Sequence, residues 1–194
     1  MKKVIPLLIV ITLAFFCPGK SQSFDFTEIK TDSMKRHFQK ILIVSTGSVE
    51  ARLFCENLST ELINDLKRNN IVAEFMYLGK DTANAIQQMK TMKPYKYDAV
   101  LTFFPADTAL YRVNNYTSTS QTSNNVIGPM LFTTRSRNVM YDQTFDIQLL
   151  EAVDQNKLIW SAALFVSSDP GSKKIYKNIS KKILLSFSMS KIIN

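Results

Sequence analysis

The chain has 194 residues, with 24 basic and 16 acidic side chains and a net charge of +8 at neutral pH. Its single histidine and two cysteines exclude a zinc site built from the usual ligands and a framework of several disulfides. The length is enough for one domain with a substantial hydrophobic core.

The first 23 residues have the layout of a secretory signal peptide. Lys2 and Lys3 precede an almost unbroken apolar run over residues 4–16, and Ser21 and Ser23 fit the small positions of a cleavage site. The run is shorter than the roughly 20 apolar residues of a membrane span. We therefore expect an exported protein, periplasmic or secreted. Three lysines and no acid leave with this leader, so the net charge falls from +8 to +5.

Processing at Cys17 is an alternative to cleavage after Ser23. Cys17 follows the apolar run directly, where a bacterial lipoprotein carries its acylated cysteine. However, Ala14 and Phe16 stand where the lipoprotein pattern places a leucine and a small residue. Simple cleavage after Ser23 fits the residues best. The second hypothesis is lipidation of Cys17, which would anchor the protein in the outer membrane. The third is a leader that stays uncleaved and acts as an anchor.

Residues 24–40 are predicted to form an N-terminal arm or a short edge strand, and residues 41–194 a single α/β domain. The apolar run 41–44 predicts a buried strand, and Ser48 caps an amphipathic helix that ends at Asn69-Asn70. Residues 71–78 predict a second strand. A short helix capped by Asp81 or Thr82 follows, and then a strand over 97–104 that continues or bends towards Val113.

The second half begins with residues 114–134, which are rich in Ser, Thr and Asn and predict a long polar loop or a ragged hairpin tip. Residues 139–153 then alternate between apolar and polar, which is typical of a half-buried antiparallel strand. A turn at 154–157 leads to a return strand over 158–166, where we expect Trp160 to be buried. The last segment is a basic amphipathic helix with Ile175 and Phe187 on its apolar face.

The order of elements predicts a mixed α/β fold. We expect a single sheet of about five or six strands, partly parallel and then antiparallel, with helices packed mainly on one face.

The search for catalytic chemistry gives little. Cys55 lies in a helical pattern and His37 lies before the first strand, so they are not expected to pair, and Cys55 is interpreted as a buried small hydrophobe. Asp142 and Asp146 stand about 13 Å apart along a strand, which suits solubilising acids better than a catalytic pair. The turn over residues 45–48 has one glycine, so we expect a tight turn and not a phosphate loop. No cofactor and no metal are expected.

Five basic residues are candidates for contact with an anionic lipid or glycan. They are Arg135, Arg137, Lys173, Lys174 and Lys177. The alternative interpretation of the three lysines is a solvated face on a helix that packs against the core.

Two strings carry a resemblance to a known group. Tyr97-Asp98-Ala99-Val100-Leu101 and Lys157-Leu158-Ile159-Trp160-Ser161-Ala162, together with the order of elements over about residues 38–192, resemble small bacterial envelope proteins and lipoproteins. These are similar to the amino-terminal domain of TolB and to the curli-secretion lipoprotein. The resemblance implies an envelope location and contacts with other proteins, and it carries over no catalytic residues.

Three hypotheses of function follow. The first is a non-enzymatic cell-envelope protein that acts through contacts with envelope protein partners. The second is a module that binds anionic lipid or glycan, with membrane association. The third is a hydrolase or transferase with a site near residues 114–134, because sites often lie on loops beside a sheet. Export argues against nucleic acid as a partner.

Overall fold

The computed structural model describes residues 22–32, 36–91, 96–107, 110–122, 130–152, 157–169 and 172–193, with the backbone alone for 30–31, 90–91, 111–122 and 130–139. The elements, in chain order, are β1 (Ser23–Thr31), β2 (Lys40–Ser45), α2 (Val49–Arg68), β3 (Val72–Tyr77), α3 (Thr82–Thr91), β4 (Ala99–Pro105), β5 (Leu110–Thr122), β6 (Met130–Glu151), β7 (Lys157–Ser168) and α4 (Lys173–Met189).

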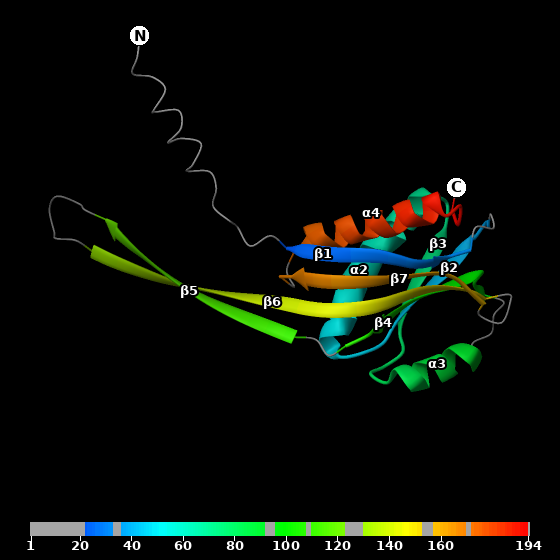
Figure 1. Ribbon diagram of the computed structural model, residues 1–194, viewed down its shortest axis with the longest axis horizontal. Coiled ribbons are helices and arrows are strands. Elements are labelled where there is room, and N and C mark those ends of the chain that lie inside the picture. The colour runs from blue at the N-terminus through cyan, green and yellow to red at the C-terminus, as the bar shows by residue number, and fades with distance from the viewer. Residues whose placement is uncertain are drawn as a thin grey trace, which may run out of the picture.

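The described strands form one mixed sheet in the order β1-β7-β6-β4-β2-β3, with β5 paired to β6 (Figure 1). β2 is parallel to both β3 and β4, and α2 and α3 make the crossovers that parallel pairing requires. The pairs β4–β6, β6–β7 and β1–β7 are antiparallel. The predicted α/β class, with a sheet that is parallel and then antiparallel, is confirmed.

The N-terminal arm or edge strand expected over 24–40 is edge strand β1, which pairs with β7 from Ser23 opposite Ser167. Phe24 and Phe26 pack against the core. Ile29, in contrast, lies at an irregularity in the pairing and is 67% exposed. Two aromatic residues therefore hold the strand against the core, and Ile29 does not.

β5 and β6 form a long antiparallel hairpin. Thr122 pairs with Met130 near its tip, and Leu110 pairs with Asp142 at its base. The interpretation of residues 114–134 as a loop is therefore wrong for 114–122 and 130–134, and the hairpin alternative is correct there; residues 123–129 lie outside the described part of the chain. Ser and Asn are poor strand signals in a sequence, and here pairing in space overrides their weak β preference.

β4 and β5 lie end to end along the same edge of β6. β4 pairs with β6 up to Pro105 opposite Phe145, and β5 takes over from Leu110. Between them, the carboxylate of Asp107 accepts hydrogen bonds from the backbone N–H of Thr144 at 3.0 Å and from its hydroxyl at 2.8 Å. These contacts hold the chain to β6 where it bends, as expected from a strand that bends past Pro105.

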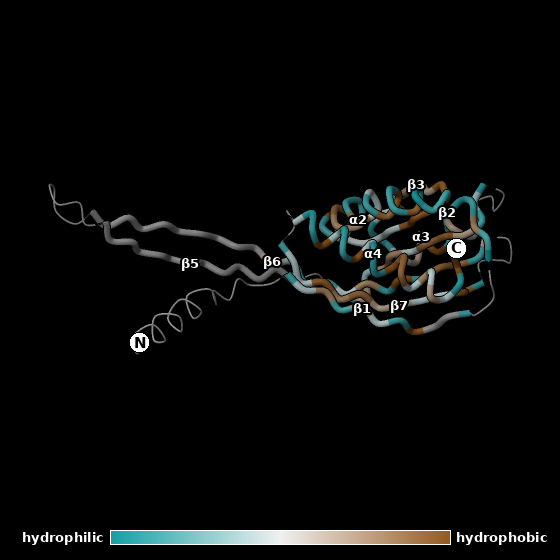
Figure 2. Tube along the Cα trace, turned by 90° about the horizontal axis from the view of Figure 1, so that it is seen from above, coloured by the Kyte–Doolittle hydropathy of each residue, from teal (hydrophilic) through white to brown (hydrophobic). Residues whose placement is uncertain are grey.

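The two faces of the sheet are covered unequally. Alternate residues of β2 point to opposite faces, so Ile41 and Ile43 join the large core with α2 and α4, whereas Leu42 and Val44 pack in a smaller cluster with Ala85 of α3. Figure 1 shows α2 and α4 together on one side of the sheet and α3 on the other, and Figure 2 shows hydrophobic segments within this body. The expectation of helices mainly on one face is confirmed.

Trp160 of β7 lies at the centre of the large core. Its side chain is completely buried, and its ring meets that of Phe187 of α4 edge-on at 4.8 Å between centroids. The indole Nε1 donates a hydrogen bond to Ser186 Oγ at 3.0 Å, and the Ser186 hydroxyl donates to Glu28 of β1. The indole therefore links β7, α4 and the edge strand, as its position on the apolar side of the return strand predicts.

Replacement of Trp160 should test this core directly. Trp160→Ala is expected to lower the free energy of unfolding by about 3–5 kcal/mol, because it removes a large buried ring and leaves a cavity. Trp160→Phe is the control, since it keeps an aromatic ring beside Phe187 and should lose much less. Circular dichroism during urea unfolding measures both variants. Native tryptophan emission near that of free indole in water would contradict the burial of Trp160.

Candidate functional site

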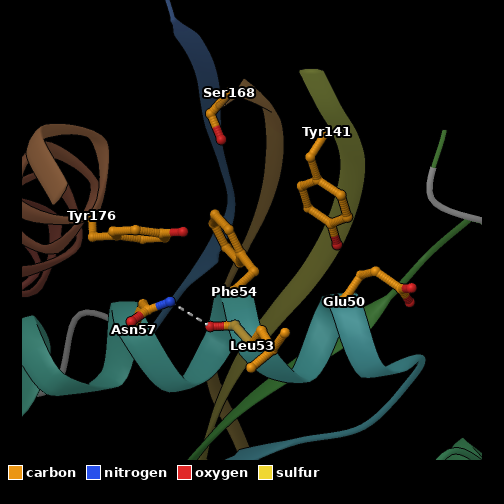
Figure 3. Close-up of a pocket in the computed structure, with 7 residues that line it drawn as sticks. All are labelled: Glu50, Leu53, Phe54, Asn57, Tyr141, Ser168 and Tyr176. Atoms are coloured by element: carbon orange, nitrogen blue, oxygen red, sulfur yellow. Dashed lines mark hydrogen bonds between the residues drawn. The ribbon is translucent and has the colours of Figure 1, made fainter. Parts of the chain in front are cut away.

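A pocket of about 170 Å³ opens where the hairpin leaves the sheet. We call it the Phe54 pocket. The N-terminal half of α2, β6, the end of β7 and the start of α4 provide its lining (Figure 3), which consists of Glu50, Leu53, Phe54, Asn57, Tyr141, Ser168 and Tyr176.

Aromatic rings form the walls of the pocket. Phe54 lies between Tyr176 and Tyr141 in Figure 3, with ring centroids 5.4 Å and 6.0 Å away. Behind these, Phe54 stacks on Phe145 at 5.1 Å with an angle of 15° between the ring planes. All four rings are buried, and their packing against one another and against the rest of the core fixes the wall.

Val49 and Leu53 lie on the outer side of α2. They are 67% and 53% exposed, because Ala51, Phe54 and Cys55 take the buried positions of the helix. Leu53 therefore stands at the mouth of the pocket.

Polar atoms in the pocket are few. The hydroxyl of Ser168 points towards the rings in Figure 3, and Ser168 is 1% exposed. Its Oγ has no hydrogen-bond partner among the described residues. In contrast, the Tyr141 hydroxyl donates to Gln143 Oε1 at 3.3 Å, and Asn57 Nδ2 donates to the Leu53 carbonyl at 2.9 Å.

Two of the ionisable groups that line this pocket have shifted pKa values. Burial raises the pKa of Tyr176, so its phenol stays neutral at physiological pH. A hydrogen bond with the Ser48 side chain lowers the pKa of Glu50, so its carboxylate is ionised at the rim. The pocket therefore offers an apolar interior with one charged group at its edge.

The turn over residues 45–48 is a tight strand-to-helix turn. The N–H of Gly47 donates to the Gly79 carbonyl at 3.1 Å, and that of Thr46 donates to the Phe103 carbonyl at 3.4 Å. Gly47 has φ +113° and a Cβ there would lie 2.5 Å from the Pro105 ring, so the position requires glycine. The amides of Thr46 and Gly47 are therefore used within the protein.

The remaining candidates for catalytic chemistry are one thiol, two carboxylates and one imidazole. Cys55 is buried, as predicted, and burial raises the pKa of its thiol. Asp146 is exposed, but the expectation that Asp142 is also exposed is wrong: Asp142 is 8% exposed, because β5 and β7 flank it on both sides. His37 is exposed.

The basic candidates lie on two separate elements. Lys173, Lys174 and Lys177 are exposed in the first turns of α4. The backbones of Arg137 and Arg135 lie on β6, four and six residues beyond Tyr141, or about 13 and 20 Å further out along the strand. The structure shows the lysines together on one helix and does not bring the arginines to them. Ser23 opens β1, and Cys17 lies outside the described residues.

A second hollow of about 340 Å³ lies between the C-terminal ends of α2 and α4. One of its acids, Asp65, already accepts hydrogen bonds from Ser180 at 2.7 Å and Arg68 at 2.7 Å. Among the described residues, no three His, Cys, Asp or Glu side chains gather as potential metal ligands. None of the described helices has the length and apolar character needed to cross a membrane.

Comparisons with known proteins give distant likenesses in fold. No family model and no curated protein matches the chain. PelC from Paraburkholderia phytofirmans, solved as a dodecamer, is 10% identical with a TM-score of 0.45, over 84% of this chain and 95% of PelC. A structure described as a neuraminyllactose-binding hemagglutinin homolog from Helicobacter pylori is 12% identical with a TM-score of 0.35, over 86% of this chain and 91% of that one. At these TM-scores neither likeness bears on function.

Sequence reasoning did not find the Phe54 pocket. Phe54 and Tyr176 sit at helical positions that also fit simple core packing, and nothing in the spacing distinguishes a pocket wall from a filled core. The one usable signal is Ser168, a hydroxyl at a position that continues the apolar alternation of β7 through Leu164 and Val166.

Cys55 provides a test of burial on this side of the molecule. Where the leader is cleaved after Ser23, or Cys17 is lipidated, Cys55 is the only free thiol that remains. At about pH 8, we expect iodoacetamide to label native Cys55 more than about 100-fold more slowly than the urea-unfolded chain, because the buried thiol is neither accessible nor ionised.

The same raised pKa should make stability fall as the pH rises above the ordinary cysteine value, because the thiol then ionises in the unfolded state and not in the folded one. Cys55→Ala is the control and should lack this component of the pH dependence. Equal labelling rates in the native and unfolded protein would show that the site is open.

Proposed function

We propose that this chain is an exported cell-envelope protein that acts without catalysis, by binding other polypeptides through the hairpin that projects from its sheet. The N-terminal leader and the resemblance to envelope proteins support the location. The single observation that carries the mode of action is that the outer edges of the projecting part of the hairpin pair with no further strand among those described. We call this part, β5 with residues 130–140 of β6, the ribbon.

Both long edges of the ribbon are open in the described structure. β7 stops opposite Tyr141, and β4 stops opposite Phe145, so residues 130–140 of β6 pair with β5 alone. β5 in turn pairs only with β6 among the described strands. An isolated two-stranded hairpin is marginally stable in water, and open edges are templates for an added strand.

The composition of the ribbon fits recognition by main-chain hydrogen bonds. Residues 114–122 carry Asn, Tyr, Thr, Ser and Gln and contain no charged residue and no proline. Lysine, proline and inward charges are the usual devices that protect an edge from another strand, and this stretch of β5 has none of them. Strand addition draws its affinity from the backbone, so a polar sequence of this kind suits it.

Photo-crosslinking in the cells that naturally make this protein tests the proposal, with a variant that carries a photoreactive residue in place of the natural protein. A photoreactive residue at Thr117 in β5 should give a defined higher-mass species in the envelope fraction, with a second polypeptide joined to this chain. The same residue at Lys182, an exposed position on α4, is the control and should give far less. Recovery of the protein in the cytoplasm, or equal products from both positions, would contradict the proposal.

Proline substitutions separate edge recognition from simple proximity. Along an antiparallel strand, successive residues direct their N–H groups alternately towards the partner strand and away from it. Of Ser118→Pro and Thr119→Pro, one therefore removes an outward N–H and should abolish crosslinking at an unchanged melting temperature. The other removes a hydrogen bond to β6 and should loosen the hairpin itself. Full crosslinking in both variants would argue against strand addition at this edge.

A further inference from the structure

We propose that the Phe54 pocket binds a single phenol-type ring, that is, one aromatic ring that carries a hydroxyl group. This inference is independent of the proposed function, because it depends on the lining of the pocket and not on the ribbon. Three features of the pocket carry it: its size, its aromatic walls and one buried hydroxyl that has no hydrogen-bond partner among the described residues.

The size of the pocket selects one ring. Its volume of about 170 Å³ is close to that of an apolar cavity of about 150 Å³ that holds benzene. Sites for larger organic ligands usually measure about 300–1,000 Å³. A fused ring system or an extended chain would therefore not fit between Leu53 and Tyr176.

The walls select an aromatic ring. Phe54, Tyr141 and Tyr176 present buried rings from three different elements, and Leu53 adds an aliphatic side at the mouth. Aromatic rings favour offset or edge-to-face contacts with centroids about 4.5–7 Å apart, which a ring placed among these three would make. A sugar ring of the same size needs hydrogen-bond partners around its whole edge, and this lining supplies few.

The position of Ser168 adds the requirement for a hydroxyl. Its Oγ is buried, lines the pocket and has no hydrogen-bond partner among the described residues. Buried polar atoms are nearly always paired, so an unpaired one at a cavity wall indicates that a group on the occupant completes it. The Tyr141 hydroxyl and the Asn57 Nδ2 already have partners within the protein, and Tyr176 hydrogen-bonds with the Asn57 side chain. Ser168 is therefore the lining hydroxyl that is left to bind the hydroxyl of the ring.

Two sources can supply this ring: a free phenolic molecule, or a tyrosine side chain of another polypeptide. The place of the Phe54 pocket in the fold is compatible with a tyrosine side chain of another polypeptide. Tyr141 and Ser168 are cross-strand partners at the point where β7 ends and the ribbon begins, so the pocket adjoins the open edge of β6. The experiment below includes a probe for each source.

Titrations of the purified exported protein by saturation-transfer NMR test the inference. p-Cresol is the first probe, toluene is the same ring without the hydroxyl, and N-acetyltyrosinamide represents a tyrosine in a chain. We expect p-cresol to bind. The ratio of the toluene Kd to the p-cresol Kd should fall by about 2- to 10-fold in Ser168→Ala, which is the value of one hydrogen bond. Toluene is more hydrophobic than p-cresol, but this difference affects the ratio equally in the natural protein and in Ser168→Ala. The change in the ratio therefore reports the hydroxyl contact alone.

Two further variants complete the design. Ser167→Ala removes a hydroxyl from the adjacent residue, which points to the opposite face of β7, and should leave the ratio unchanged. Leu53→Trp is tolerated by the fold because Leu53 is half-exposed, and it should block all three probes by filling the mouth. Binding of N-acetyltyrosinamide as tightly as p-cresol would identify a tyrosine side chain as the occupant, and binding of p-cresol alone would identify a free phenol.

Two results would overturn the inference. The first is the absence of p-cresol binding at millimolar concentration, which would leave the pocket as a water-filled hollow. The second is a toluene to p-cresol ratio that Ser168→Ala does not change, which would show that the ring binds without the hydroxyl contact.

Discussion

The continuous pairing of β6 is the constraint on which the rest of the structure depends. Over residues 145–151 this strand is hydrogen-bonded on both sides, to β4 and to β7, and its Phe145, Ile147 and Leu149 are completely buried. Beyond Tyr141, over residues 130–140, the same strand has one partner among the described strands, β5. One strand therefore belongs to a closed core at one end and to an open ribbon at the other, and its register in the core fixes the direction in which the ribbon projects.

The fold could be predicted to a large extent because its core elements carry strong periodic signals. The buried strand at 41–44, the capped helix from Ser48 and the alternating strand after Val139 all follow from apolar spacing, and the Ser48 side chain does accept the predicted capping bond from the Ala51 N–H. The hairpin arms could not be predicted in the same way. Their Ser, Thr and Asn residues show no regular alternation of apolar and polar side chains in the sequence, and only pairing in space makes them strands.

The candidate site could not be predicted from the sequence, for a related reason. Phe54 and Tyr176 have the same helical spacing as Leu58 and Ile179, whose side chains are completely buried in the core. Whether an aromatic residue fills a core or lines a pocket depends on what faces it across the fold. Here the partner is Ser168 at the end of β7, and the pairing of β6 with β7 sets that neighbour.

Amide hydrogen exchange along β6 tests most directly the claim that a closed core and an open ribbon share this strand. In the purified protein, amides of residues 143–151 should exchange at rates governed by global unfolding, and those of residues 130–140 should exchange much faster, because local opening of a two-stranded ribbon needs little free energy. In the crosslinked envelope species, residues 130–140 or their partners in β5 should gain protection. Uniform slow exchange along the whole of β6 in the isolated protein would contradict the account.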